Sequence, residues 1–171
     1  MANRLRSITG IKIIGMKPDH WPEVKTIYEE GIATGKATFE TTAGDWEKWD
    51  SSHLKDLRFV ACENEMVLGW VALSPASGRC VYGGVAEVSV YVRPSESGRG
   101  IGSALLNHLI EQSEKAGYWT LQAGIFEENT QSIRLHEKCG FRIVGKREKL
   151  GQLHGEWKDI ILMERRSSTV G

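Results

Sequence analysis

The hydrophobic positions of this chain change their spacing several times between the amino and carboxyl ends. Short apolar or alternating runs, typical of strands, occupy residues 11–16, 59–62, 66–73, 85–92, 119–125, 141–149 and 158–163. Apolar residues recur at helical spacing in four segments, which begin near Pro18, Asp45, Ile101 and Asn129. This order of elements predicts a single mixed α/β domain over residues 11–165. We expect residues 1–10 to form an extension and residues 166–171 a flexible tail.

Charge and composition then narrow the possible classes of protein. The chain has 22 basic and 22 acidic residues, so no basic excess exists to neutralise a nucleic-acid backbone. No run approaches the roughly 20 apolar residues needed to span a membrane, and the basic start lacks the apolar stretch of a signal peptide. The three cysteines and five histidines have neither disulfide nor metal-ligand spacing. We therefore expect a cytoplasmic protein with no metal, no nucleic-acid partner and no membrane partner.

The glycine-rich turn at residues 97–103, Ser-Gly-Arg-Gly-Ile-Gly-Ser, leads from the strand at 85–92 into a helix. The first amides of a helix have no partner within the helix, and together with the helix dipole they favour a bound phosphate. Arg99 would add a charged fork to that phosphate. The alternative is a sharp turn without a ligand, but three glycines in five residues exceed what a turn needs. The segment matches neither the Walker A loop nor the dinucleotide fingerprint.

Several segments together resemble the GNAT superfamily of N-acetyltransferases: residues 87–92, 98–102, Asn129 and 135–141. The closest resemblance is to its phosphinothricin and methionine sulfoximine acetyltransferase branch, through Phe39-Glu40, Arg79 with Tyr82, residues 87–92, residues 135–137, and His-Gly-Glu-Trp-Lys-Asp at 154–159. The resemblance implies a mostly antiparallel central sheet flanked by helices. It also implies a homodimer in which residues 154–159 reach the partner. One departure is Ser97, which stands where the family usually has Arg or Gln.

The resemblance further implies acetyl-CoA as co-substrate, with its pyrophosphate at the glycine turn. The expected contacts are Val90, Tyr91, Val92, Gly98, Arg99, Gly100, Ile101, Gly102, Ser103, Asn129 and Ser132. Among them, the backbone amide of Val90 would polarise the thioester carbonyl. Asn129 would bind the pantetheine arm, cap the helix that follows it, or do both.

Two residues are candidates for the chemistry. Glu87 lies in an otherwise apolar strand, where burial would raise its pKa and suit it to accept a proton from the acceptor amine. The alternative is a glutamate on the solvent side of the strand. His136 is the second candidate, as the acid that protonates the departing thiolate, and its alternatives are packing or substrate contact.

The expected acceptor is a small amino-acid-like molecule. Arg79 with Tyr82 would bind its carboxylate, and Phe39 and Trp157 would form apolar walls unless they belong to the core. Two other functions stay open. One is acetylation of a protein or peptide by the same fold, and the other is a non-catalytic acyl-CoA-binding sensor.

Overall fold

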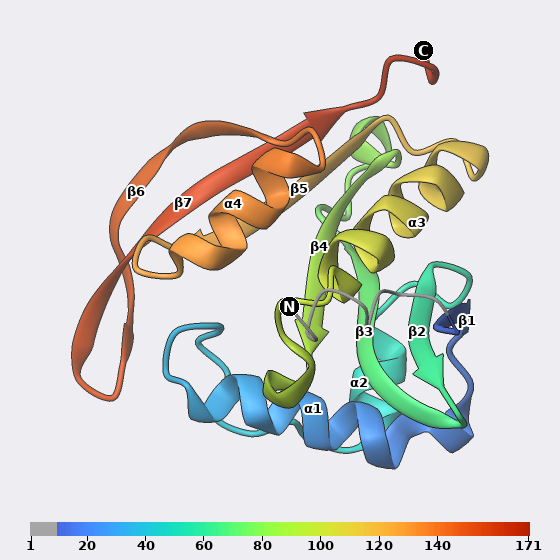
Figure 1. Ribbon diagram of the computed structural model, residues 1–171. Coiled ribbons are helices and arrows are strands. Elements are labelled where there is room, and N and C mark those ends of the chain that lie inside the picture. The colour runs from blue at the N-terminus through green and yellow to red at the C-terminus, as the bar shows by residue number, and fades with distance from the viewer. Residues whose placement is uncertain (1–9) are drawn as a thin grey trace.

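The chain folds around one seven-stranded sheet with the strand order β1-β2-β3-β4-β5-β7-β6 (Figure 1). The structure is a computed structural model that describes residues 10–171, so nearly all of the expected N-terminal extension lies outside the described part. The strands are β1 (Lys12–Gly15), β2 (Arg58–Glu63), β3 (Met66–Pro75), β4 (Val85–Val92), β5 (Thr120–Phe126), β6 (Arg142–Leu153) and β7 (Glu156–Arg166). Every neighbouring pair is antiparallel except β4 and β5, which are parallel. The predicted fold class is therefore confirmed.

Four helices cover the two faces of this sheet, with short 3-10 turns at Pro18–His20, Cys80–Tyr82 and Pro94–Glu96. The helices are α1 (Trp21–Ala33), α2 (Trp46–Ser52), α3 (Ile101–Lys115) and α4 (Thr130–Lys138). Side chains cap two of them, since Asp45 accepts a hydrogen bond from the amide of Lys48 and Asn129 accepts one from the amide of Ser132. No helix within residues 10–171 has the length and apolar character to cross a membrane.

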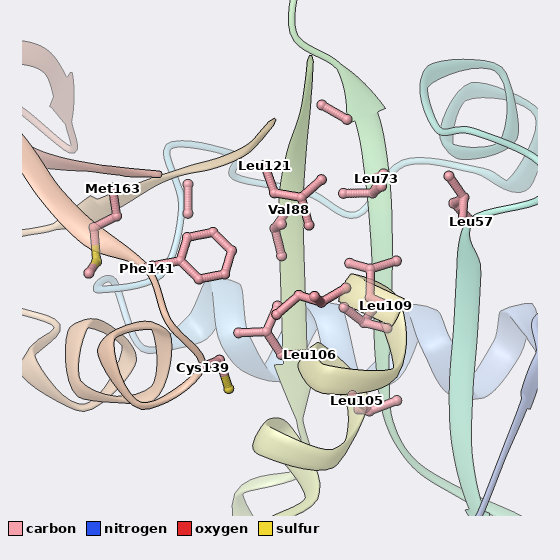
Figure 2. Close-up of a cluster of buried hydrophobic side chains, with 14 of the residues drawn as sticks. Leu57, Leu73, Val88, Leu105, Leu106, Leu109, Leu121, Cys139, Phe141 and Met163 are labelled. Carbon is pink, nitrogen blue, oxygen red and sulfur yellow. The ribbon is translucent and has the colours of Figure 1, made fainter. Parts of the chain in front are cut away.

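The main core lies between α3 and the sheet (Figure 2). Leu105, Leu106 and Leu109 are fully buried on one face of α3, because residues three and four positions apart share a helix face. They pack against apolar residues of the strands, including Leu73 and Val88. The helical spacing read from the sequence thus identifies the face of α3 that the sheet covers.

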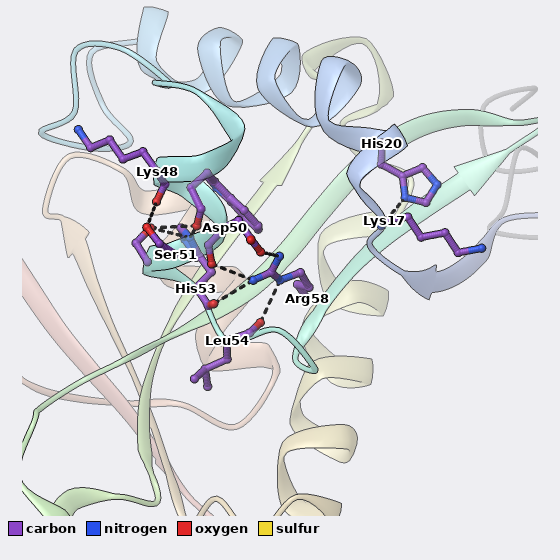
Figure 3. Close-up of polar contacts among 10 residues, drawn as sticks. Lys17, His20, Lys48, Asp50, Ser51, His53, Leu54 and Arg58 are labelled. Carbon is purple, nitrogen blue, oxygen red and sulfur yellow. Dashed lines mark hydrogen bonds and ion pairs between the residues drawn. The ribbon is translucent and has the colours of Figure 1, made fainter.

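A second core lies on the opposite face of the sheet, under α1 and α2. Alternation along β3 serves both cores, since Val71 and Leu73 belong to the first and Trp70 and Ala72 to the second. Near this second core, the buried Arg58 at the start of β2 pairs with Asp50 of α2 (Figure 3). Its guanidinium also donates to the carbonyl oxygens of Asp50, His53 and Leu54, which joins the end of α2 to the sheet.

The carboxyl-terminal hairpin is longer than the sequence pattern predicts. Strands were expected at 141–149 and 158–163, but β6 continues to Leu153 and β7 runs from Glu156 to Arg166. His154 and Gly155 form the turn between them with φ values of 49° and 81°, the left-handed conformation of a two-residue hairpin turn. Polar residues and glycines hide the strand pattern there, and cross-strand pairing stabilises the hairpin instead.

The last residues, where a flexible tail is expected, carry hydrogen bonds to the rest of the chain. The amide of Ser167 donates to the carbonyl oxygen of Trp119. The Ser167 hydroxyl donates to Glu114 at 3.0 Å and accepts from the amides of Thr169 and Val170. These contacts connect the end of β7 to α3 and to the start of β5.

Candidate active site

A cavity of about 870 Å³ opens where β4 and β5 separate. The two strands pair only between residues 85–87 and 120–122, so the rest of β4 pairs with β3 alone and the rest of β5 with β7 alone. The volume lies in the usual range for a small-molecule site. A second cavity of about 500 Å³ lies between α1 and residues 41–44 and contains none of the predicted site residues.

The larger cavity collects most of the predicted site residues. Its walls include Phe39, Glu87, Val90, Tyr91, Val92, Gly98, Gly100, Ile101, Gly102, Ser103, Asn129, Ser132 and His136. Arg79, Tyr82, Arg99 and Trp157 do not line it. Of the predicted residues outside the cavity, Arg79, Tyr82 and Trp157 came from the narrower resemblance, and Arg99 belongs to the glycine turn.

The glycine turn has the conformation and the open space of an anion site. Gly98 and Gly100 have φ values of 82° and 81°, and a Cβ built on either would meet no atom within 4 Å. Gly102 serves a different purpose. A Cβ at this position would lie 3.2 Å from Leu135, so the absence of a side chain allows α3 to approach α4 closely. The helix α3 begins at Ile101, which leaves its first amides without helical partners beside this space.

Arg99 does not supply the charged fork that the sequence predicts for the phosphate. Its guanidinium pairs with Glu63 of β2 at 2.9 Å and with Glu96 at 2.7 Å. These carboxylates raise the pKa of the Arg99 guanidinium above its usual range. The side chain therefore connects the glycine turn to the neighbouring strand, and an anion there would be held by the backbone.

The edge of β4 that faces the cavity carries backbone amides that point away from β3. In an antiparallel pair, alternate residues direct their N–H groups toward the partner strand. The amide of Arg93 donates to Leu68 of β3, so Tyr91 shares that direction, and Val90 and Val92 direct their amides to the other edge. That edge faces β5, which has already separated. The register thus directs the amide of Val90 away from β3 into the opening, as the carbonyl-polarising role requires.

Glu87 lies at the point where the two strands separate. The Glu87 side chain is half-buried, and Glu87 pairs with Gln122 of β5. Its Oε1 atom lies 4.0 Å from the position that a Cβ atom on Gly124 would occupy. Burial raises the pKa of Glu87, and a hydrogen bond from Gln122 partly opposes this shift. The carboxylate belongs to the cavity wall rather than to the solvent side of the sheet, and it suits a proton acceptor near neutral pH.

His136 is buried, with 2% of its surface exposed, and lines the cavity from α4. Its Nδ1 lies 2.7 Å from the carbonyl oxygen of Ser132, and a carbonyl only accepts, so Nδ1 carries the hydrogen. Its Nε2 is buried and has no hydrogen-bond partner among residues 10–171. Burial also lowers the pKa of His136. The ring is thus neutral with a bare acceptor nitrogen, which suits a hydrogen-bond acceptor better than the predicted acid.

Asn129 holds two segments of the cavity wall together. Its Oδ1 caps α4 through the amide of Ser132 at 3.2 Å, and its Nδ2 donates to the carbonyl oxygen of Lys36 at 3.3 Å. The predicted capping role is present. A pantetheine arm would have to compete with Lys36 for the amide group.

Phe39 anchors residues 36–40 to the far half of the sheet. Its ring meets Phe126 of β5 edge to face at 4.8 Å. A Cβ on Gly151 of β6 would lie 3.1 Å from the same ring. Phe39 is therefore both part of a small core, with Phe126, Leu153 and Ile160, and part of the cavity wall.

Arg79, Tyr82 and Trp157 lie outside this cavity. The loop before β4 folds into a 3-10 turn in which the Arg79 guanidinium lies over the Tyr82 ring at 5.5 Å. Trp157 is 55% exposed beside the hairpin turn. The predicted carboxylate clamp is thus not assembled beside Glu87 within one chain.

The cavity residues that the sequence did not predict include Lys36, Gln122, Arg147 and Leu150. Gln122 and Arg147 share a sheet face with Glu87 only through the strand order, which no local pattern indicates. Only the alternation of side chains along the strand at 119–125 could have indicated Gln122. This alternation places Gln122 on the other sheet face from the buried Leu121 and Ala123.

The fold and the cavity define a class: a single α/β domain whose split sheet opens beside a glycine turn and the start of a helix. Residues 19–141 match the acetyltransferase (GNAT) family. The chain belongs to this family and is an acyltransferase.

Two curated relatives cover most of the chain. A phosphinothricin N-acetyltransferase of Streptomyces coelicolor is 32% identical over 88% of this chain and 92% of its own length. An L-methionine sulfoximine/L-methionine sulfone acetyltransferase of Pseudomonas aeruginosa is 30% identical over 84% of this chain and 87% of its own length.

Solved structures of similar fold include acetyltransferases that are named for different acceptors. A phosphinothricin acetyltransferase from Sinorhizobium meliloti, in complex with acetyl-CoA, has a TM-score of 0.84 and 28% identity, over 92% of this chain and 88% of that one. A ribosomal-protein-alanine N-acetyltransferase from Brucella melitensis has a TM-score of 0.85 and 29% identity, over 91% of this chain and 99% of that one.

Proposed function

We propose that this protein transfers the acetyl group of acetyl-CoA to the amino group of a small amino-acid-like acceptor. The observation that carries the proposal is the shared cavity, in which the glycine turn, the β4 amides that point away from β3 and the buried Glu87 meet. The names of the two curated relatives support an amino-acid-like acceptor, and the Sinorhizobium meliloti complex supports acetyl-CoA.

The residues present fit this co-substrate. The open space at Gly98 and Gly100 suits a diphosphate, and the bare Nε2 of His136 suits a hydrogen-bond donor of a bound molecule. Residues 98–103 would hold the diphosphate through their backbone amides. When bound, acetyl-CoA supplies the acetyl group as a reactive thioester.

Glu87 acts as the general base. An amino-acid ammonium with an ordinary pKa of about 8 is mostly protonated at neutral pH, and Glu87 accepts that proton directly or through a water molecule. The amide of Val90 donates to the acetyl carbonyl. His136 accepts a hydrogen bond at Nε2 and orients the group that donates it, while Nδ1 stays bound to Ser132.

We also propose a homodimer formed through the β6–β7 hairpin. Several large apolar side chains on and near the hairpin are exposed, namely Ile143, Val144, Leu150 and Trp157, and such a patch often marks an interface. Val81 and Tyr82 are exposed as well. Sedimentation of the full chain tests this, and a monomer at micromolar concentration would exclude the dimer.

The experiment that tests the proposed function measures thiol release from acetyl-CoA with a panel of acceptors. The panel contains free amino acids, methionine sulfone, methionine sulfoximine, phosphinothricin, polyamines and short peptides. We expect turnover with the free amino acids or their analogues and little with polyamines. CoA binding without thiol release from any acceptor would instead favour a non-catalytic sensor.

A second candidate function, acetylation of a peptide amino terminus, is favoured by the name of the Brucella melitensis structure. The short peptides in the panel decide between the two. Turnover with peptides that exceeds turnover with every free amino acid would replace our proposal by this one.

A further inference from the structure

The cationic side chains of the cavity differ in where they lie. Two of them, Lys36 and Arg147, line the wall. Lys36 lies in the segment that Phe39 anchors to β5 and β6, and its carbonyl oxygen accepts a hydrogen bond from Asn129. Arg147 lies on β6, opposite Ile160 of β7, at the far half of the sheet. Arg147 is therefore the cation that a strand of the acceptor end contributes to the wall.

The Arg147 side chain has no partner in the described part of the chain, whereas two other basic residues of β6 are paired. Its guanidinium makes no hydrogen bond or ion pair with any of residues 10–171. The preceding residue, Lys146, pairs with Glu127 and Asp159, and Arg142 pairs with Glu164. Ion pairs thus occupy Arg142 and Lys146, whereas Arg147, which lines the cavity, has none within residues 10–171.

The strand register places Arg147 on the same sheet face as Glu87. Glu87 pairs with Gln122 of β5, and residues two positions apart in a strand share a face, so Phe126 lies on that face too. Phe126 pairs with Ile160 of β7, and Ile160 pairs with Arg147 of β6. Cross-strand partners also share a face.

The distance across this face fits a small acceptor. The strand order β4-β5-β7-β6 puts three strand intervals between Glu87 and Arg147, which is about 14 Å across the sheet at roughly 4.8 Å for each interval. The register also offsets them by the four residues from Gln122 to Phe126, roughly 13 Å along the strands, so their backbones lie about 19 Å apart. The two side chains occupy part of that distance. What lies between them is largely apolar, because Phe126, Ile160 and Leu162 line the cavity there.

We propose that Arg147 determines acceptor specificity by pairing with an oxyanion of the acceptor while Glu87 takes the proton from its amine. The acceptor class is then a small amine that also carries a carboxylate or a phosphinate. The inference rests on the proposed function and assigns the carboxylate contact to Arg147 instead of Arg79. A guanidinium suits this role because its paired donors match the two oxygens of such a group.

The test compares R147M, R147K and the control K146M. Methionine in place of Arg147 keeps an apolar stem and removes the charge. Lys146 is adjacent, points away by strand parity and does not line the cavity. The acceptors are methionine sulfone, phosphinothricin and the α-carboxamide of each. The steady-state KM for each acceptor is measured, together with calorimetric binding of the acceptor to the CoA-bound protein.

We expect R147M to raise KM and weaken binding about tenfold to a hundredfold for acceptors with an oxyanion. The carboxamide of methionine sulfone, which has no oxyanion, should change less than twofold. R147K should restore part of the affinity, and K146M should match the wild type. Loss with phosphinothricin carboxamide as well would identify the phosphinate as the group that Arg147 binds, and loss with methionine sulfone would identify the α-carboxylate.

An equal loss with methionine sulfone and with its carboxamide, or no loss with any of the four acceptors, would overturn the role of Arg147 alone, since wild-type turnover would still support the proposed function. A wild-type chain that acetylates none of these acceptors would overturn both.

Discussion

The two ends of the cavity are built in different ways. The glycine-turn end consists largely of one continuous stretch, from β4 through residues 97–103 into α3, and it offers mostly backbone amides. The acceptor end consists of side chains from residues 36–40, β4, β5, β6 and β7, which are far apart in the sequence. One end is a local motif, and the other exists only once the sheet has formed.

This difference explains which of the predicted site residues the structure brings together in one cavity. Gly98, Gly100 and the amide of Val90 lie where the motif predicts, because a turn and a strand register are local properties. At the acceptor end, Arg79 is outside the cavity and Arg147 is inside it. A carboxylate-binding arginine can come from any strand that reaches the face, and the spacing of residues does not indicate which one does.

The largest effect should come from the residue at the boundary of the two ends. We expect Glu87→Gln to lower turnover on the order of a hundredfold to a thousandfold while the dissociation constant for CoA changes less than twofold. The base must be deprotonated, and burial raises its pKa. Wild-type rates should therefore rise with pH through a value above the ordinary 4.3 of a glutamate, and this rise should vanish in the variant. The pH profile of thiol release measures both.

Glu40→Gln is the matched control, because Glu40 is another carboxylate of the cavity wall. Its variant should keep the wild-type pH profile. If Glu87→Gln retained wild-type turnover, the base would have to be another group.

A smaller effect should isolate the backbone-built end. Gly100→Ala places a methyl group in the space proposed for the diphosphate, and we expect the dissociation constant for CoA to rise about tenfold, since a fraction of the amide contacts is lost. The KM of the acceptor should stay within twofold. Isothermal titration with CoA gives the first value.

Gly117→Ala separates backbone strain from ligand contact. Gly117 has φ of 89° and no atom within 4 Å of its Cβ position, like Gly100, but it follows the other end of α3. Both variants should lose about 1–2 kcal/mol of unfolding free energy. Similar CoA affinities in the two variants would remove the diphosphate from the glycine turn.

The smallest effect concerns His136 and the stability of the fold. Burial lowers the pKa of His136 in the folded state, so the unfolded chain binds the proton first as the pH falls below about 6.5. The folded state then loses up to about 1.4 kcal/mol per pH unit until its own lower pKa is reached. His136→Asn keeps a donor for the Ser132 carbonyl and should reduce this loss, as measured by urea unfolding at several pH values.

His53, whose pKa is also lowered by burial, is unchanged in both proteins and provides the reference slope. If the wild type and His136→Asn lost stability equally between pH 7 and pH 5, the neutral, buried state of His136 would be contradicted.

The sequence alone determined the α/β class, the glycine turn and the amphipathic face of α3, because each depends on residues close together in the chain. Only the tertiary structure decided the length of the last hairpin, the ion pairs that occupy Arg99 and the arrival of Arg147 beside the cavity. These follow from strand order and cross-strand register, through which residues separated by tens of positions become neighbours. Local spacing contains no information on which distant strand will lie next to which.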